Sequence, residues 1–575
     1  MASVDMAERV PPLGAASLRG TGARVWRALT AERVTISVSV LALLLRLWGI
    51  NFGLPYAVHP DEPVVNGTVL HMLRVPTANP DTFIYPSGLY YYLVVIASLY
   101  QLITGHLIGS PPDTTGLGLY PNPDAIIWMR VGVALIGVAA VAVVYRTTRA
   151  LVGPWPALGA ALLLACSPLH IIQSQIATTD GVSATGVTLL AACCVLAVRT
   201  ESRRAFWFAG IALGLATGIK YNVAVGGVML LAAFGVVYWR EHRRGLLSLR
   251  GVLHDRRLLA FAFAPLAFLV TTPFALLAPG PFLKDVGSVF LHYDVQGHPG
   301  VAGSSLVYTL SEMFGHYETL LSALACVGVV YALLRRRSDA LIVAAGAAAY
   351  FILVAAPKVH FERNLVPLWP LLAILAGEGI AAIGALLALC GTALARRIRG
   401  RGSLIAMLAQ NRFIQAVVVV AVLLVLLQPT LARAVQSDSI RAAPDVQATA
   451  SFWINQHVPA GATIAYESYS VTLDPQRFRL TYLRAGLYTE PLEWYAEQHI
   501  QYAVASQMYY ARFFDATPED FPSERAAYAD MFAHWTIVQT FVGSNTDGGM
   551  PGGKIVLLRI TPPGTRAAHP VAPYP

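Results

Sequence analysis

Residues 34–62 read VTISVSVLALLLRLWGINFGLPYAVHPDE, an apolar run that ends in two adjacent acids. About 17 to 25 apolar residues allow a helix to cross the hydrocarbon core of a bilayer. The run therefore predicts a first transmembrane helix near residues 34–50. It has no small-residue cleavage site of the kind that marks a removable signal peptide, so we expect it to remain as an anchor.

The composition of the whole chain is typical of a membrane protein. Of 575 residues, 56% are hydrophobic and only 13% are charged, and the mean hydropathy is +0.56. A soluble domain of this size needs more charge to cover its surface. The net charge of +9 comes from Arg clusters between apolar runs, where the positive-inside rule places them, and does not indicate nucleic-acid binding. The five cysteines lie in or near apolar runs and predict neither disulfides nor a zinc site.

Ten further apolar runs are long enough to span a membrane. They lie near residues 125–146, 154–172, 181–199, 205–221, 222–239, 257–273, 313–334, 339–356, 365–392 and 413–433. Eleven crossings with a cytoplasmic N-terminus put every Arg-rich connection in the cytoplasm and the C-terminus outside. The sequence therefore predicts a cytoplasmic tail over residues 1–33 and an all-α polytopic membrane domain over residues 34–433, in the plasma membrane.

Residues 85–108, YPSGLYYYLVVIASLYQLITGHLI, are also apolar enough to form a span. If they crossed fully, every later Arg-rich connection would move to the outside. We therefore expect a juxtamembrane or re-entrant helix that does not cross, within a first external loop over residues 51–124. The tyrosines at its start suit the membrane interface.

The chain becomes polar after about residue 434. Strand-like segments at 462–466, 501–506, 536–542 and 554–560 are separated by Pro, Gly and helical stretches such as 445–457. This pattern predicts a small extracytoplasmic α/β domain over residues 434–575. We expect it to pack over the external mouth of the membrane domain, with Trp453 in its core.

Asp61 and Glu62 are the sharpest chemical feature, because they follow an apolar helix directly on the external side. Solvated loop acids are common, and that is the alternative. A carboxylate at this depth can act as a general base on an attacking hydroxyl. Desolvation at the low-dielectric boundary raises its proton affinity, which favours that role.

Asp180 and Lys220 lie at external junctions between predicted spans. Asp180, in SQIATTD, is either the N-cap of the helix that starts near Gly181 or part of a site. Lys220, in GLATGIKYN, is costly at that depth without an anionic partner such as a lipid phosphate, and snorkelling toward headgroups is the alternative.

Two further external loops carry cations and histidines. In PKVHFERN, Lys358, His360 and Arg363 precede a span, and an Arg fork suits bidentate phosphate contact. The loop LHYDVQGHPG contains His292, Asp294 and His298, which could bind a metal, although their spacing also suits a plain polar loop.

The segment LLLRLWGINFGLPYAVHPDE resembles the opening of GT-C glycosyltransferases of the protein O-mannosyltransferase and aminoarabinose-transferase type. YPSGLYYY, the helix that begins at Arg130, SQIATTD, GLATGIKYN and FERNLVPLWPLLAILAG resemble further family segments in the same order. The likeness covers about residues 34–392. Where the family has Pro-Pro-Leu, this chain has Pro-Ser-Gly at residues 86–88.

The resemblance implies an inverting glycosyltransferase that uses a polyprenyl-phosphate-linked sugar. Asp61 is then the general base, Glu62 supports it or binds the sugar, and Lys220, Arg363 and Lys358 bind the donor phosphate. Asp180 corresponds to a second acid that binds a metal in some members. It remains, with four histidines, a candidate for substrate contact or for a divalent cation: His59, His360, His292 and His298.

The resemblance leaves the sugar open, and it leaves three classes of acceptor: a protein hydroxyl, a lipid or a glycan. Two other classes of protein are alternatives. A transporter or flippase of lipid-linked sugars should have charges in mid-span and broken helices in matched halves. Here Arg46 is the main charge within a span, and no repeat is visible. A membrane-anchored binding or scaffold protein would leave the external acids and cations unexplained.

Overall fold

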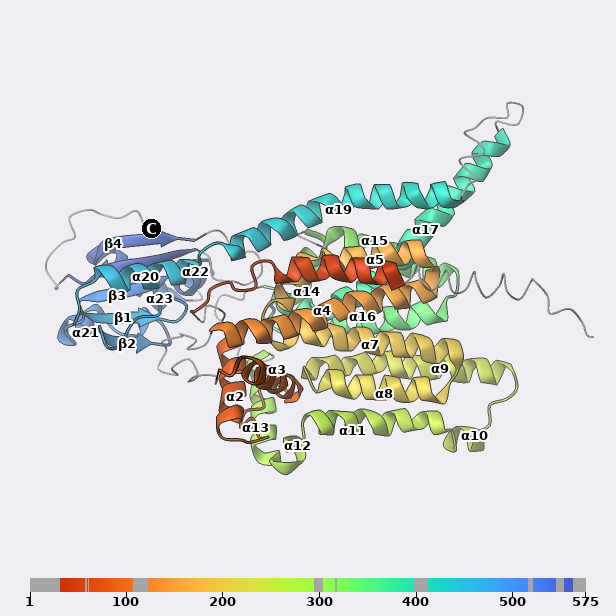
Figure 1. Cartoon of the computed structure of the whole chain (residues 1–575), viewed down its shortest axis with the longest axis horizontal. Helices are drawn as coiled ribbons and strands as arrows, with labels where there is room; N and C mark the ends of the chain where they lie inside the picture. The colour runs from red at the N-terminus through yellow and green to blue at the C-terminus, as the bar shows by residue number, and fades with distance from the viewer. Residues whose placement is uncertain are drawn as a thin grey trace, which may run out of the picture.

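The apolar runs form a bundle of long helices, and the polar tail forms a separate sheet domain at one end of it (Figure 1). The structure is a computed structural model. It describes residues 32–56, 59, 61–106, 123–293, 303–315, 318–397, 412–515, 521–543 and 553–561. The predicted cytoplasmic tail therefore lies almost entirely outside the described residues.

Most predicted spans coincide with one main helix, and two of them, 154–172 and 313–334, each run over a bent pair of helices. The first is the helix over residues 32–47. The others in the helical domain are α2 (Glu62–Arg74), α3 (Gly88–Thr104), α4 (Pro123–Val152), α5 (Pro154–Ala165), α6 (Pro168–Ser174), α7 (Thr179–Thr200), α8 (Arg203–Thr217), η1 (Tyr221–Gly226), α9 (Gly227–Arg243), α10 (Leu249–Leu253), η2 (Arg256–Leu259), α11 (Ala260–Thr271), α12 (Phe274–Leu277), α13 (Pro279–Leu291), α14 (Ser305–Gly315), α15 (Thr319–Leu334), α16 (Ser338–Ala355), η4 (Glu362–Leu365), α17 (Leu368–Arg397) and α19 (Arg412–Ala442).

The predicted count of eleven crossings is not confirmed. Among the described residues, five helices are long and apolar enough to cross a membrane, or up to seven if each of two bent pairs is one span. The shortfall has a geometric reason. Helices α8 and α11 contain 15 and 12 residues, which at 1.5 Å per residue fall short of a hydrocarbon core of about 30 Å.

One bend places the segment that leads to Asp180. Helices α5 and α6 meet at an angle of 61°. Pro168 begins α6, and because proline has no N–H and blocks the preceding turn, the first helix cannot continue through it. The side chain of Ser167 instead accepts a hydrogen bond from the backbone N–H of His170, which caps the new helix.

Arg46, the charge within the first apolar run, is fully buried and has partners. Its guanidinium donates to the carbonyls of Ala42 and Ala165 and lies 2.6 Å from Nδ1 of His170. These contacts satisfy the charge inside the bundle and join the first helix to the bend between α5 and α6. The charge of Arg46 within the first span therefore has a structural role, and it does not require the polar pathway of a transporter.

Helix α3 is anchored by the glycine at which the chain departs from the family pattern. Helices α2 and α3 run across the end of the bundle rather than along it (Figure 1). The N–H of Gly88 donates to the carbonyl of Gly218 at 2.9 Å, and a Cβ at residue 88 would lie 2.5 Å from that oxygen. Only glycine fits this close approach, which holds the start of α3 against the turn that carries Lys220.

The tail forms a five-stranded mixed sheet in the order β2-β1-β3-β5-β4. Its strands are β1 (Thr463–Glu467), β2 (Arg479–Leu483), β3 (Tyr502–Ser506), β4 (Thr536–Val542) and β5 (Lys554–Arg559). Strands β2, β1 and β3 are parallel, whereas β5 runs antiparallel to β3 and β4. The helices of this domain are α20 (Val446–His457), η5 (Leu487–Thr489), α21 (Leu492–Glu497), α22 (Gln507–Asp515) and α23 (Pro522–His534).

The sheet domain has its own core on both faces. One apolar cluster lies under α20 and contains Ile464, Val504 and Leu557, and the other lies under α22 and α23. Trp453 is partly buried against the first cluster. Helix α19 extends to Ala442, and α20, the first helix of the sheet domain, begins at Val446.

Candidate functional site

Asp61 and Arg363 form an ion pair that joins opposite ends of the helical domain's sequence. Asp61 directly precedes α2, and Arg363 lies in the short η4 turn before α17. Nη1 of Arg363 donates to the Asp61 carboxylate, and each side chain is 24% exposed. The two residues proposed from the sequence as base and phosphate ligand therefore lie side by side at one accessible position.

His59 orients this acid. Its Nδ1 accepts hydrogen bonds from the backbone N–H groups of Asp61 and Glu62, both at 3.2 Å. Burial lowers the pKa of His59 below its usual value, although both neighbouring acids act to raise it. The imidazole is therefore neutral at pH 7, which its role as an acceptor through Nδ1 requires. By accepting from the first N–H groups of α2, His59 does what an N-cap side chain usually does.

Asp180 and Lys220 form a second ion pair, with Nζ of Lys220 2.5 Å from the Asp180 carboxylate. The two side chains are 8% and 14% exposed, so Lys220 does not snorkel to the surface. Asp180 is not the N-cap of its helix, because α7 starts at Thr179 and Thr178 occupies the cap position. The carboxylate is thus used to hold a buried cation.

Asn364 connects the two ion pairs. Its side-chain oxygen lies 3.4 Å from Nζ of Lys220, and it follows Arg363 in the chain. The carbonyl of Asn364 accepts from the hydroxyl of Tyr350, which also accepts from Asn222 at 3.0 Å. This network runs from α16 back to the turn after Lys220 and fixes the spacing of the two cations.

Electrostatics show that the two pairs form one cluster. Burial acts to lower the pKa of Arg363, but the carboxylates of Asp61 and Asp180 more than compensate and hold it above its usual range. Burial first, and the Asp61 carboxylate next, raise the pKa of Tyr85 well above its usual value, so its hydroxyl stays protonated. Two acids, two cations and a tyrosine hydroxyl therefore lie within electrostatic reach of one another.

Glu62 has a different place from its neighbour Asp61. Its carboxylate is fully buried and forms a bidentate ion pair with Nε and Nη2 of Arg130, at 2.8 and 2.6 Å. It also accepts from the N–H of Ala177, while Arg130 donates to the carbonyls of Ile50 and Phe52. These contacts tie α2, α4 and the approach to α7 together beneath Asp61.

The other predicted candidates lie apart from this cluster. Lys358 is exposed, and no ion pair among the described residues involves it. His360 is partly buried beside Ser305 and the ring of Tyr308. His292 ends α13, whereas Asp294 and His298 lie outside the described residues.

The described residues contain no group of three or more His, Cys, Asp or Glu side chains arranged to hold a metal ion. Asp180, the acid that the resemblance linked to a metal, has Lys220 as its partner instead.

The sheet domain contributes a residue that the sequence did not single out. Tyr469, between β1 and β2, has a φ of 61°, a left-handed conformation that is uncommon for a bulky side chain. Burial raises its pKa, and the charges of Arg512, Asp61 and Arg363 also act on it. The tail therefore approaches the Asp61–Arg363 pair, and the only local signal was an aromatic residue in a predicted loop.

This geometry can support displacement at a phosphate-bearing carbon. Only one N–H group of Arg363 is used by Asp61 among the described contacts, and Lys220 uses two of its three donors. The remaining donors can bind an anionic leaving group. The neighbouring carboxylate of Asp61 can accept a proton from an incoming hydroxyl.

Residues 124–278, about a quarter of the chain, match the model of the family described as dolichyl-phosphate-mannose-protein mannosyltransferase. The matched segment runs from α4 to α12 and includes Asp180 and Lys220. The match indicates a membrane glycosyltransferase. No curated protein matches the chain.

The chain is also similar to several solved structures. ArnT from Cupriavidus metallidurans bound to undecaprenyl phosphate is 16% identical, with a TM-score of 0.49 over 94% of this chain and 98% of that one. The Archaeoglobus fulgidus oligosaccharyltransferase tethered with an acceptor peptide is 15% identical, with a TM-score of 0.49 over 91% and 75%. The S. cerevisiae Pmt1–Pmt2 protein O-mannosyltransferase complex is 21% identical, with a TM-score of 0.32 over 48% and 36%.

Proposed function

We propose that the protein transfers a sugar from a polyprenyl-phosphate carrier to an acceptor hydroxyl, with inversion at the anomeric carbon. The observation that carries the proposal is the joint cluster of the Asp61–Arg363 and Asp180–Lys220 ion pairs. It combines a base with two cations for a phosphate. The description of the matched family names dolichyl-phosphate-mannose as the sugar donor. Dolichyl phosphate belongs to the class of lipid carrier that we propose here.

In the proposed step, the acceptor oxygen attacks the anomeric carbon and Asp61 takes its proton. The bond between that carbon and the phosphate oxygen breaks at the same time, and the phosphate leaves with the electron pair. Lys220 and Arg363 stabilise the charge that develops on it. A single displacement from the face opposite the leaving group inverts the configuration.

Asp180 and Glu62 act as positioning residues in this scheme. Asp180 orients the ammonium of Lys220, and Asn364 fixes the distance between the two cations. Glu62 holds the start of α2 through Arg130. Lys358 is exposed and lies outside the cluster. If it binds the donor phosphate, it does so at the surface of its loop.

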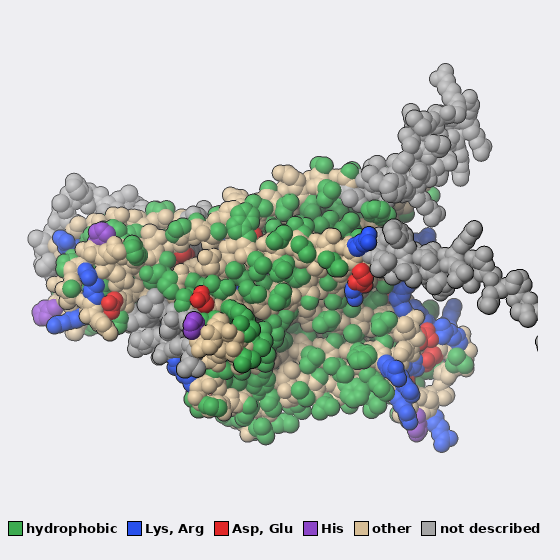
Figure 2. Space-filling view, in the orientation of Figure 1, with side chains coloured by type: hydrophobic (Ala, Val, Ile, Leu, Met, Phe, Trp, Pro, Cys, Tyr) green, Lys and Arg blue, Asp and Glu red, His purple; other side chains and the backbone are tan. Residues whose placement is uncertain are grey.

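We also place the reaction on the extracytoplasmic face. Lys and Arg side chains gather at the end of the helical domain far from the sheet domain, with a largely apolar surface between (Figure 2). By the positive-inside rule that basic end is cytoplasmic. The sheet domain and α2, which Asp61 directly precedes, lie at the other end (Figure 1). The acceptor is then an extracytoplasmic protein hydroxyl, lipid or glycan.

The test is transfer by the purified protein in nanodiscs, with a polyprenyl-phosphate sugar as donor. We expect transfer from the lipid-linked donor but not from a nucleotide sugar, and a product of inverted anomeric configuration by NMR. A product of retained configuration would exclude the single displacement. Lipid-linked sugars that accumulate in a deletion strain would identify the natural donor.

A further inference from the structure

A cavity of about 540 Å³ lies at the end of the helical domain far from Asp61. Its walls come from the turn between α7 and α8, the end of α9, and the segment over residues 246–257 that includes α10. Figure 1 shows α9 and α10 extending to the end of the helical domain away from α2. The volume is within the range of small-ligand sites, about 300–1,000 Å³. Nothing in the proposed transfer reaction uses this cavity.

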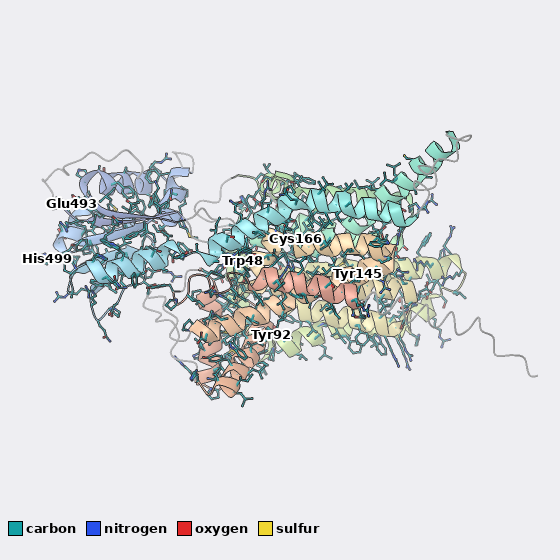
Figure 3. The ribbon with its side chains drawn as sticks, turned by 45° about the horizontal axis from the view of Figure 1, so that its top comes forward. Trp48, Tyr92, Tyr145, Cys166, Glu493 and His499 are labelled. Atoms are coloured by element: carbon teal, nitrogen blue, oxygen red, sulfur yellow. The ribbon has the colours of Figure 1, made fainter. Side chains whose placement is uncertain are left out.

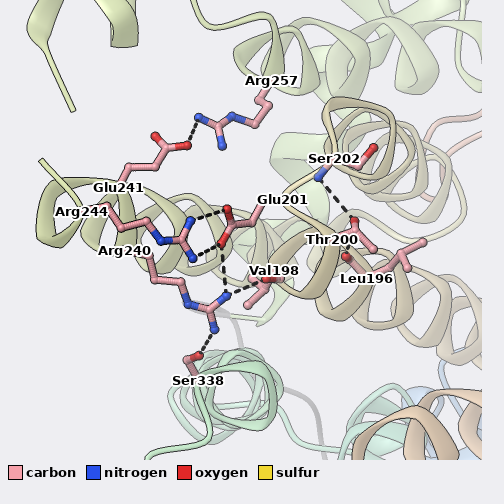
Figure 4. A network of polar contacts seen from close by, with 10 residues as sticks. All are labelled: Leu196, Val198, Thr200, Glu201, Ser202, Arg240, Glu241, Arg244, Arg257 and Ser338. Atoms are coloured by element: carbon pink, nitrogen blue, oxygen red, sulfur yellow. Dashed lines mark hydrogen bonds and ion pairs between the residues drawn. The ribbon is translucent and has the colours of Figure 1, made fainter. Parts of the chain in front are cut away.

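The acids that line the cavity are all neutralised by arginines. Glu201 forms ion pairs with Arg240 at 3.7 Å and Arg244 at 2.9 Å (Figure 4). Asp255 and Glu241 both pair with Arg257, at 2.6 and 2.8 Å. The carboxylates are therefore not available for a cation, and they fix the surrounding side chains in place.

Two further arginines leave the cavity with excess positive charge. Arg203 and Arg256 line it and are exposed, and neither has a carboxylate partner among the described residues. Trp207 holds them on one wall: its ring lies 5.9 Å from the Arg203 guanidinium, and its Nε1 donates to the carbonyl of Arg256. Three arginines and three acids line the cavity, and Arg240 and Arg244 pair with Glu201 from outside the lining. The cavity and its immediate surroundings therefore hold five arginines for three acids.

The rim of the cavity is apolar and open. Leu246 and Leu253 are each 70% exposed and Leu249 is 79% exposed. Leu249 and Leu253 are four residues apart in α10 and lie on one side of it, whereas Leu246 precedes the helix. Exposed leucines beside arginines are typical of a segment that lies at the headgroup level of a bilayer. Of these three leucines, Leu246 lines the cavity itself, and the other two lie in α10 beside it.

We propose that this cavity binds the phosphate of an anionic phospholipid, with Arg203 and Arg256 as the phosphate ligands. The acyl chains then extend past the exposed leucines of α10. Arginine suits this task because its planar fork donates two parallel hydrogen bonds to a phosphate. Basic pockets between helices on the cytoplasmic side are a recognised form of lipid site.

The test uses the full-length protein in neutral detergent, titrated with short-chain phosphatidylglycerol or phosphatidylcholine, with the melting temperature as readout. We expect saturable stabilisation by phosphatidylglycerol alone. Arg203→Gln and Arg256→Gln should each raise the half-saturating concentration about tenfold, because each removes charge-assisted hydrogen bonds to the phosphate. Arg203→Lys keeps the charge but loses the fork, so it should weaken binding less than Arg203→Gln, and it shows that the position tolerates change.

Arg204→Gln is the matched control, because Arg204 is the exposed neighbour of Arg203 and does not line the cavity. It should stay within about twofold of the wild type, since general attraction of lipid to a basic surface adds little per charge in neutral detergent. Equal losses in Arg203→Gln and Arg204→Gln would overturn the site. So would equal stabilisation by both lipids, or competition by glycerol phosphate at lipid-like concentrations.

Discussion

Asp61 and Glu62 are adjacent in the chain, yet their carboxylates belong to separate ion pairs in different surroundings. Glu62 is buried and bound on both oxygens by Arg130, whereas Asp61 is partly exposed and meets Arg363. Consecutive residues at a helix start point about 100° apart, so one faces the bundle and the other faces the site. We therefore assign the role of base to Asp61 and a structural role to Glu62.

Asp61→Asn should lower turnover by about 10²- to 10⁴-fold, because the amide keeps the shape of the side chain and loses its basicity. Donor binding should persist. The measurement is turnover with a defined donor and acceptor, beside donor affinity. Asp81→Asn, an exposed acid of the same loop, is the control and should have no effect on rate. Near wild-type turnover in Asp61→Asn would make Asp180 the next candidate for the base.

Lys220→Ala and Arg363→Ala should each weaken donor binding, because each removes donors that we assign to the carrier phosphate. The loss should be about tenfold or more for each. Donor affinity in nanodiscs is the readout. Lys284→Ala removes the same charge from an exposed position on α13 and should bind donor normally. Unchanged affinity in both site variants would remove the phosphate assignment.

Glu62→Gln should destabilise the protein by about 3–5 kcal/mol, because it leaves the buried Arg130 charge without a counter-charge. The comparison is Glu32→Gln, which breaks an exposed pair with Arg146 and should change stability by less than about 1 kcal/mol. Unfolding in detergent measures both. If Glu62→Gln keeps full stability but loses turnover, Glu62 touches substrate after all.

The sheet domain should lose stability as the pH rises from about 5 to about 7. Burial raises the pKa of Glu467 to about 7 from a usual value of 4.5, although the hydroxyl of Tyr528 and two backbone N–H groups act to lower it. The folded domain therefore holds a proton that the unfolded chain releases above pH 4.5. This stabilisation is complete below that pH and declines as the pH rises through the folded pKa.

The Glu467 effect amounts to about 3 kcal/mol at most. Differential scanning calorimetry of the full chain at pH 5 and pH 7.5 should show it, with Glu467→Gln as the reference that cannot titrate. The wild type and the Gln variant should differ more at pH 7.5 than at pH 5. A difference that is independent of pH would show that Glu467 is charged in the folded domain across this range.

The topology can be tested with cysteines introduced at Thr115 and Glu493. Glu493 lies in the sheet domain, on the side away from the helical domain (Figure 3). Both positions should react with a membrane-impermeant reagent added from outside. If Thr115→Cys reacts only from the cytoplasm, residues 85–108 cross the membrane and the predicted arrangement of the first loop is wrong.

The elements were largely predictable, because apolar runs and strand-like alternation are local signals. Four of the five strands lie within a residue or so of the predicted segments. Strand β2 was missed: it is at the sheet edge, and none of its five residues is buried, so its sequence RLTYL lacks a core pattern. The span count was less predictable, since a composition window does not show that a helix stops after 12 residues.

The candidate site was predictable in its members but not in its pairings. Asp61, Asp180, Lys220 and Arg363 stand out because charges are scarce at the membrane surface. Their partners depend on which helices are neighbours, and one sequence does not contain that information. Arg130 lies within an apolar run, and in the sequence it stands out only as part of a segment that resembles the family. Its buried ion pair with Glu62 could be found only from the structure.

The 302 positions that separate Asp61 from Arg363 also have a consequence for how the protein is made. Ribosomes add about 5–20 residues per second, so Arg363 is synthesised roughly 15 to 60 seconds after Asp61. During that interval the nascent chain is already entering the membrane but lacks the loop before α17. A chain released early therefore carries the acid without the cation beside it, and transfer activity begins only when insertion is nearly complete.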